Sequence, residues 1–222
     1  LEQQGYDVTY GSNADGIDVD FITRCKTFLS VGHDEYWDIR QYQAAETAIE
    51  RGVNYLWLSG NSVFIVSPFS DSASGSPKRT ITREGCYGVL RNDEIESYEA
   101  MFAGLRDTGL DERRIIGARS VVPFNGGGDW TCSNPQHWLF QGTGMKRGES
   151  IAGLVGWEHH GEPDLERHGL QVVAEGSVWA GGTREGKYAA TIFPGGNGNF
   201  VFNAATIFWS QGLSTPPGHI LP

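Results

Sequence analysis

Ser30-Val31-Gly32-His33-Asp34-Glu35-Tyr36-Trp37 joins a short apolar run to a polar segment that begins a helix. The apolar run, residues 27–31, is typical of a buried strand. At the helix start, Asp38 can cap the first turn and Gln41 can return the bond, which is the reciprocal pattern of a capping box. The polar side chains of this stretch are therefore expected at the carboxyl end of a strand, where open α/β sheets bind their ligands.

A helix and a second strand are expected directly after this stretch. Apolar residues recur at helical spacing, polar residues occupy the opposite face, and Gly52 supplies the stop. A second apolar run, residues 53–58, ends in Ser59-Gly60-Asn61. This order is that of a βαβ unit whose two polar loops open on the same edge of a sheet, so it predicts an α/β core. The apolar positions of the helix are Ile39, Tyr42, Ala45 and Ile49.

The remainder of the chain favours β-structure. Residues 6–10 alternate like a short strand, residues 67–78 have the composition of an exposed loop, and residues 94–105 have helical spacing. Beyond residue 150, short apolar runs alternate with glycine-rich turns, as in hairpins. We expect the chain to close with a strand at 199–203 and a short helix near 206–212.

We expect residues 1–222 to form a single α/β domain decorated by β-rich insertions. Leu1-Glu2-Gln3-Gln4-Gly5 has the pattern of the last turn of a helix and its glycine stop. The sequence therefore predicts that the first strand and helix of the domain are missing from this chain.

Composition excludes several classes of partner. With 27 acidic and 17 basic residues, the formal net charge is -10. Nucleic-acid binders concentrate Lys and Arg, so neither nucleic acid nor an anionic membrane surface is expected as a partner. The three cysteines contain no CxxC pair, which favours buried thiols over a disulfide framework or a zinc site. The compartment is left open by the sequence, with the cytoplasm slightly favoured.

The expected strand end suits metal chemistry better than nucleophilic catalysis. No Ser or Cys lies between Val31 and Ile39, so a Ser-His or Cys-His hydrolase is unsupported. Carboxylate and phenolate oxygens favour hard cations, and phenolate favours ferric iron in particular. Glu158 follows another apolar run, so we expect it at a strand end too. A purely structural role for His33 and Tyr36 is an equal alternative, because buried His and Tyr usually satisfy a backbone group.

The pair His159-His160 resembles a metal-binding pair, but adjacent residues on a strand point to opposite faces. We therefore do not expect both rings to bind one ion.

Several of these motifs resemble the C-terminal domain of the N,N-dimethylformamidase large (β) subunit family. The motif Gly32-His33-Asp34-Glu35-Tyr36-Trp37 is the most specific part of the resemblance, and the glycine-rich pieces are less so. The resemblance covers most of the chain, through residues 1–10, 30–37, 52–61, 137–138, 142–144, 153–158 and 198–204.

This resemblance implies a flavodoxin-like, class I glutamine amidotransferase-like three-layer α/β sandwich. It also implies a mononuclear iron site, one Fe3+ per chain, held by two tyrosines and one glutamate. Tyr36 and Glu158 match one tyrosine and the glutamate. The other tyrosine is expected upstream of Leu1, with Tyr6 a poorer candidate.

The function expected from residues and resemblance together is hydrolysis of a small amide or related C–N bond. Tyr36 and Glu158 would hold the iron, and His33 or Glu35 would move protons. Asn61 would hydrogen-bond a small-molecule substrate. Residues 62–66 depart from the family pattern, so a different pocket is expected. Members of the family also vary in domain make-up, so dimethylformamide itself is not carried over as substrate. A homo-oligomer, or further domains of a longer chain, is compatible with this expectation.

The alternative is a non-catalytic module that binds a ligand such as a carbohydrate. Large aromatic side chains with polar rims make such sites. The aromatic residues considered for it are Trp130, Trp138, Trp157 and Trp179.

Overall fold

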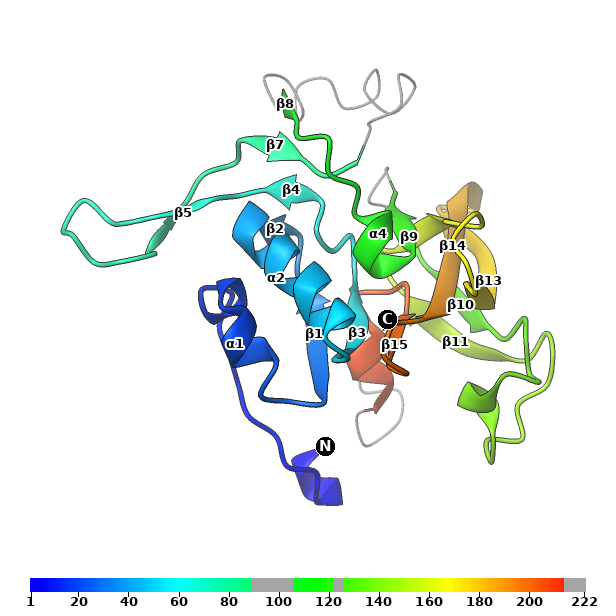
Figure 1. The fold of residues 1–222 in the computed structure, drawn as a ribbon. Coiled ribbons are helices and arrows are strands. Elements are labelled where there is room, and N and C mark those ends of the chain that lie inside the picture. The colour runs from blue at the N-terminus through cyan, green and yellow to red at the C-terminus, as the bar shows by residue number, and fades with distance from the viewer. Residues whose placement is uncertain (89–105, 122–125, 214–222) are drawn as a thin grey trace.

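The computed structural model describes residues 1–88, 106–121 and 126–213, so the helix predicted for residues 94–105 lies outside the described residues. Its centre is a five-stranded mixed sheet, in the order β1-β3-β15-β14-β13 (Figure 1). β1, β3 and β15 run parallel, while β14 and β13 run antiparallel to their neighbours. The strands are β1 (Thr27–His33), β3 (Asn54–Gly60), β13 (Gln171–Ala180), β14 (Thr183–Pro194) and β15 (Phe200–Asn203).

The predicted βαβ unit is confirmed. β1 and β3 pair in parallel register from Thr27↔Asn54 to His33↔Gly60, and α2 (Ile39–Glu50) connects them. The capping box of Asp38 and Gln41 is present at the start of α2. The φ of +100° at Gly52 ends the helical path just beyond its last turn.

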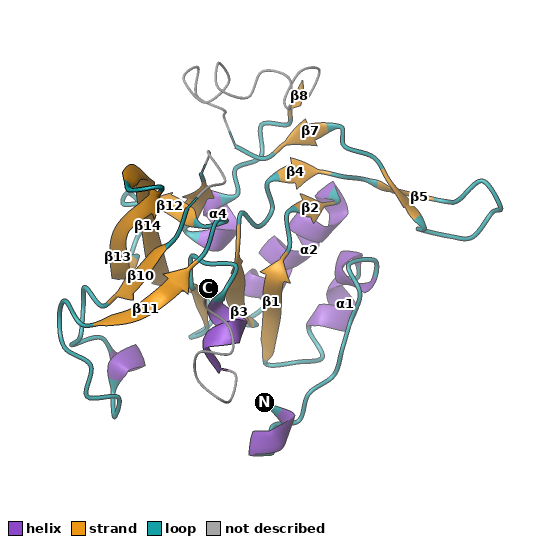
Figure 2. Ribbon diagram, turned by 180° about the vertical axis from the view of Figure 1, so that it is seen from behind, coloured by secondary structure: helices purple, strands orange, loops and turns teal. Residues whose placement is uncertain are grey.

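Side-chain alternation on the strands divides the core into two layers. On β3, Tyr55 and Trp57 pack beneath α2, whereas Leu56 and Leu58 face the opposite side. That opposite side is covered by the antiparallel pair β10 (Gly128–Thr131) and β11 (Ser150–Val155). Figure 2, which shows the back of the molecule, displays this β-pair on the side of the sheet away from α2. One face of the sheet is therefore covered by helix and the other by β-structure.

Two buried tryptophans join neighbouring elements to this sheet: Trp57 of β3 bonds to α4, and Trp130 of β10 bonds to the residue after β15. The Trp57 indole donates a hydrogen bond of 2.8 Å to the carbonyl of Ile115, and the Trp130 indole donates one of 3.0 Å to that of Ala204. Both rings are almost fully buried, so their N–H groups need these partners.

Several short elements complete the fold. A four-stranded sheet, β2-β4-β7-β8, lies beyond the carboxyl end of β1, and the β5–β6 hairpin projects from it as an exposed arm (Figures 1 and 2). The short strands are β2 (Tyr36–Trp37), β4 (Ile65–Val66), β5 (Phe69–Ser70), β6 (Thr80–Ile81), β7 (Gly85–Cys86), β8 (Arg106–Asp107), β9 (Ala118–Ser120) and β12 (His160–Pro163). The other helices are α1 (Val19–Ile22), α4 (Arg113–Ile116) and the 3-10 turns η1 (Glu2–Gln4), η2 (Asp15–Ile17), η3 (Trp138–Phe140) and η4 (Trp209–Leu213).

The predicted flavodoxin-like, three-layer α/β sandwich is wrong. Among the described residues only three α-helices occur, and only α2 is longer than four residues. Most of the regular structure is β-strand, arranged in several small sheets. The reason is the second half of the chain, where antiparallel hairpins supply β10–β11 at the place where a sandwich of this class has a second layer of helices.

Smaller predictions had mixed outcomes. Residues 6–10 form no strand. The N-terminal turn is a 3-10 turn that ends at Gly5 with a φ of +80°, and β15 and η4 lie where a last strand and short helix were expected. The three cysteines are free thiols, two of them buried. Within the described residues, no helix has the length and apolar character needed to span a membrane.

The cap of α2 gives a test of the βαβ unit. The Asp38 carboxylate accepts hydrogen bonds of 2.8 Å from the backbone N–H groups of both Arg40 and Phe69. Asp38→Ala should lower the free energy of unfolding by roughly 2 kcal/mol, because a helix cap and a buried acceptor are lost together. Urea denaturation measures this. Asp20→Ala is the control, since the Asp20 side chain is 81% exposed; an equal loss in both variants would contradict the assignment.

Candidate functional site

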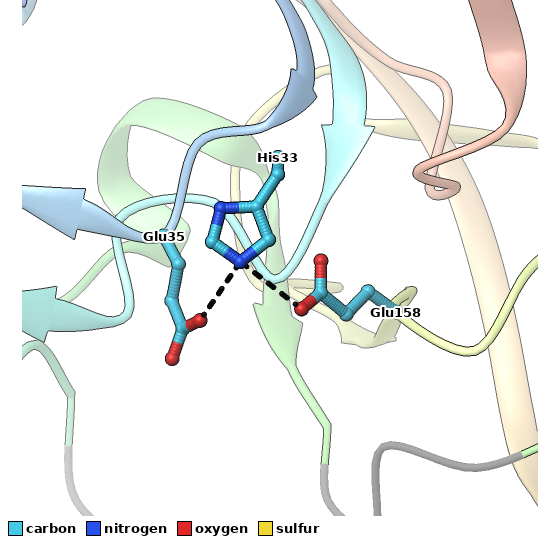
Figure 3. A group of neighbouring side chains, drawn as sticks. All are labelled: His33, Glu35 and Glu158. Atoms are coloured by element: carbon cyan, nitrogen blue, oxygen red, sulfur yellow. Dashed lines mark ion pairs between the residues drawn. The ribbon is translucent and has the colours of Figure 1, made fainter.

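Three ionisable side chains converge where β1 ends. The His33 Nε2 atom lies 3.3 Å from an oxygen of Glu35 and 3.4 Å from an oxygen of Glu158. Figure 3 shows the imidazole between the two carboxylates. Ligand atoms of the three residues lie within 4.8 Å of one another, which is close enough to share a metal ion. The carboxylates are buried, whereas the side chain of His33 is 44% exposed. The site is thus buried on its acidic side and open to solvent at the imidazole.

Tyr36 lies beside this cluster. Its ring stacks on the His33 imidazole with centroids 5.7 Å apart and an angle of 29° between the planes. The pKa of the Tyr36 phenol is raised, mainly by burial and further by the Glu35 and Glu158 carboxylates. The phenol is therefore close enough for the charges of both carboxylates to affect its pKa.

The turn after β1 holds His33, Glu35 and Tyr36 in place. The Asp34 carboxylate accepts hydrogen bonds of 2.6 Å from the Ser30 hydroxyl and 2.8 Å from the Trp37 indole. The carbonyl of Glu35 accepts from the N–H groups of Phe64 and Ile65, each at 3.0 Å. These bonds redirect the chain from β1 into β2. The side chains of His33, Glu35 and Tyr36 thereby lie close together.

Glu158 reaches the cluster from a distant part of the chain. Its loop follows β11 and crosses over the last residue of β3, Gly60. A Cβ atom on Gly60 would overlap the carbonyl oxygen of Glu158. The same carbonyl accepts a hydrogen bond of 3.1 Å from the N–H of Ile207. The absence of a side chain at residue 60 therefore allows this crossing.

His160, two residues after Glu158, is anchored by a buried hydrogen-bond chain. His160 Nε2 accepts a bond of 2.9 Å from the N–H of Ser62, so its Nδ1 carries the proton and donates 2.7 Å to Asn203 Oδ1. Burial lowers the pKa of His160 to about 4, which keeps the ring neutral at physiological pH. The Glu158 loop is thereby joined to the loop after β3 and to β15.

Burial dominates the electrostatics of the two acids. Burial, together with the neighbouring Glu35 carboxylate, raises the pKa of Glu158 to about 8. The pKa of Glu35 is also raised by burial, although His33 partly opposes this. One Glu158 oxygen, Oε2, is buried with no hydrogen-bond partner. Such a group is stabilised by a proton or by a cation.

Asn61, Tyr6 and the pair His159-His160, which the sequence also singled out, are not part of this cluster. Asn61 follows β3 with a φ of +46° and is fully buried, and its Oδ1 accepts a bond of 3.4 Å from the N–H of Val121. Within the part of the chain that the structure describes, no hydrogen bond or ion pair joins Asn61 to the cluster. Tyr6 is 65% exposed on the N-terminal segment and likewise has no such contact. Neither His159 nor His160 belongs to the group of possible ligands.

The four tryptophans considered for a ligand-binding module are not all exposed to solvent. Trp130 is only 2% exposed and belongs to the core beneath β10, so it is not available to a ligand. Trp138, Trp157 and Trp179 are exposed.

An apolar cavity adjoins the site. It has a volume of about 590 Å3 and is bordered by His33 and Asp34, with Leu29 and Leu58 among its other walls. Glu35 and Glu158 do not line it. The cavity therefore meets the cluster at the imidazole.

Sequence reasoning missed the groups that hold the site together. Gly60 was noted only as part of a polar loop, and His160 only as a possible ligand. Thr206, whose hydroxyl accepts from Gly156 N–H at 3.1 Å and donates to the Leu154 carbonyl at 2.8 Å, was not singled out. The signal for Gly60 was its place at the end of a strand; nothing local signals Thr206 or Asn203.

Comparison with known proteins identifies the family. The family model described as N,N-dimethylformamidase beta subunit-like, C-terminal, matches residues 1–219, and the chain therefore belongs to this family. No curated protein sequence matches the chain.

The crossing over Gly60 gives a first prediction for the site. Gly60→Ala should lower the free energy of unfolding by roughly 2–3 kcal/mol, because the new methyl group meets backbone that cannot move aside alone. Gly196→Ala is the matched control, since a Cβ there meets nothing within 4 Å. Thermal and urea unfolding of both variants would measure the difference. Equal stability of the two would show that the Glu158 loop does not depend on this contact.

The buried His160 gives a prediction of pH dependence. Its pKa of about 4 in the folded protein lies below the usual 6.5, so the unfolded chain takes up a proton first as pH falls. The associated stability is present above pH 6.5 and is lost between pH 6.5 and 4, by roughly 3 kcal/mol in total. Unfolding measured from pH 7 to 4.5 should show a shallower decline in His160→Gln than in the wild type. The exposed His168, changed to Gln, should leave the slope unchanged; an unaltered slope in His160→Gln would refute the assignment.

Proposed function

We propose that this N,N-dimethylformamidase beta subunit-like domain is a hydrolase of a small amide or related C–N bond that depends on one iron ion. Membership of the family supports a hydrolase at a coarse level. The observation that carries the finer proposal is the buried Glu158 carboxylate, which has one unpartnered oxygen and a second carboxylate beside it.

The residues of the cluster fit a hard cation. Two buried carboxylates repel each other, and burial without a counter-charge is costly for both. A cation between them would offset both effects and would engage the free oxygen of Glu158. Carboxylate, imidazole and phenol together are donors that suit iron. The chemistry and placement of the donor set therefore support a metal site.

Glu158 and Tyr36 are the proposed ligands, with His33 or Glu35 able to supply a further donor. A bound ferric ion would supply Lewis-acid polarisation of a carbonyl and a lowered pKa for a bound water. Tyr36 would bind as phenolate, which requires a cation close by because its pKa in the metal-free site is raised.

His33 and Glu35 are proposed to move protons. Burial raises the pKa of Glu35 above its ordinary value, which favours a role in proton transfer to a neighbouring group. The half-exposed imidazole of His33, 3.3 Å from Glu35, can pass that proton between the buried acid and solvent. Together they would deliver a proton to the leaving nitrogen.

The proposed substrate is a small molecule. The cavity of about 590 Å3 beside His33 has leucine walls that suit short apolar substituents. Asn61, whose Nδ2 is buried without a partner, is proposed to donate a hydrogen bond to substrate if the loop after β3 opens.

Metal content and turnover test this proposal together. The purified full chain should contain about one iron per chain and hydrolyse at least one amide of a panel of N-alkyl formamides and acetamides. Glu158→Gln should weaken iron binding by roughly a hundredfold or more and abolish hydrolysis, because the ligand charge is lost. The exposed Glu149, changed to Gln, is the control and should retain both. Wild-type protein that binds no iron from a ferric or ferrous solution would refute the proposal.

A further inference from the structure

A second cavity lies at the opposite end of the central sheet from the His33 cluster. It has a volume of about 720 Å3 and is bordered by the end of β14 and the start of β15. β15 runs parallel to β3, so its first residue, Phe200, lies at the end of the sheet remote from Gly60. The seven residues of β3 place the two ends of the sheet roughly 20 Å apart. The cavity is thus separate from the proposed hydrolytic site.

One wall of this cavity is an exposed aromatic ring held in a fixed position. Trp138 is 55% exposed although it lies against two other rings. Phe200 meets it edge-on, with centroids 5.2 Å apart and an angle of 72°. His137 packs on its other side at 5.3 Å, and the His137 Nδ1 accepts a bond of 3.2 Å from Leu139 N–H at the start of η3. The indole is therefore an exposed platform that two neighbouring rings hold in position.

Next to this platform is a pair of amide side chains. Asn134 Nδ2 donates a hydrogen bond of 3.1 Å to Gln171 Oε1. This bond uses one donor and one acceptor, and it fixes the two side chains side by side. Asn134 Oδ1 and Gln171 Nε2 remain as an acceptor and a donor on two residues that line the cavity. Two adjacent hydroxyl groups, each able to donate and accept, match such a pair.

The described residues that border the cavity include no Lys, Arg, Asp or Glu. Burial lowers the pKa of His137, so this ring is neutral at physiological pH. A charged ligand would find no counter-charge there, and a nucleic acid would find no cation for its phosphates. The wall combines apolar rings with neutral hydrogen-bonding groups, which favours a neutral ligand with an apolar face and a hydroxylated edge.

We propose that this cavity, formed around Trp138, Asn134 and Gln171, binds a neutral saccharide. The indole would cover the C–H face of one sugar ring, and the amide pair would bind two adjacent hydroxyls of the same ring. This site is additional to the proposed amide hydrolysis and does not depend on it.

Affinity gel electrophoresis with soluble polysaccharides tests the proposal. The full chain is run through native gels that contain a neutral β-glucan, xylan, mannan or dextran, and its migration is compared with a gel without polysaccharide. At least one polysaccharide should retard the wild type. Trp138→Ala should weaken that binding roughly tenfold or more, because a central aromatic contact is removed. Gln171→Ala should weaken it too, with the aromatic platform intact.

Trp179→Ala is the matched control, because Trp179 is 50% exposed but does not border the cavity. It should be retarded like the wild type, and thermal unfolding would show that all variants are folded. The proposal is overturned if no neutral polysaccharide retards the wild type, or if Trp138→Ala migrates as the wild type does. Retardation by a polyanion alone, or binding of a proline-rich peptide without any saccharide, would overturn it as well.

Discussion

The contact between Gly60 and the backbone of Glu158 is the constraint on which the site depends. β1 and β3 end in register, and the turn after β1 brings Glu35 beside His33, with the Tyr36 ring stacked on the His33 imidazole. A fourth group can join them only if another segment crosses the end of β3 at van der Waals distance. Residue 60 lacks a side chain, and the Glu158 carbonyl occupies the space a methyl group would take. A local backbone feature thus determines which distant side chain completes the cluster.

The crossing has an electrostatic consequence. It buries a carboxylate whose Oε2 has no partner and places it near a second buried carboxylate, with only the imidazole of His33 between them. Burial raises the pKa of both acids, and the Glu35 carboxylate adds to the rise at Glu158, whose pKa of about 8 favours its protonated form at neutral pH when no metal is bound. Fold stability gains nothing from such an arrangement, since apolar side chains in the same place would pack without this penalty. The arrangement is understandable if the site handles protons or a cation.

Local signals in the sequence were sufficient for the βαβ unit formed by β1, α2 and β3. The capping box at Asp38 and the glycine stop at Gly52 specify α2, and two apolar runs specify the strands on either side. The same turn revealed His33, Glu35 and Tyr36 as neighbours, because they are adjacent in the chain. The fold class was mispredicted because a βαβ unit does not determine what covers the far face of its sheet. Here hairpins such as β10–β11 cover it, and this depends on pairings between residues far apart in sequence. The approach of Glu158 and the His160–Asn203 bond are long-range contacts of the same kind, so spacing could not reveal them.

The central claim is that the buried acid Glu158 and the phenol of Tyr36 share a metal ion. The most direct measurement is an anomalous-difference map from crystals of the full chain loaded with iron, with data collected on both sides of the iron absorption edge. The account predicts a single strong peak bounded by Glu158 and Tyr36, beside His33 and Glu35, which is present above the edge and absent below it. A map without a peak there, or with iron bound elsewhere, would contradict the account.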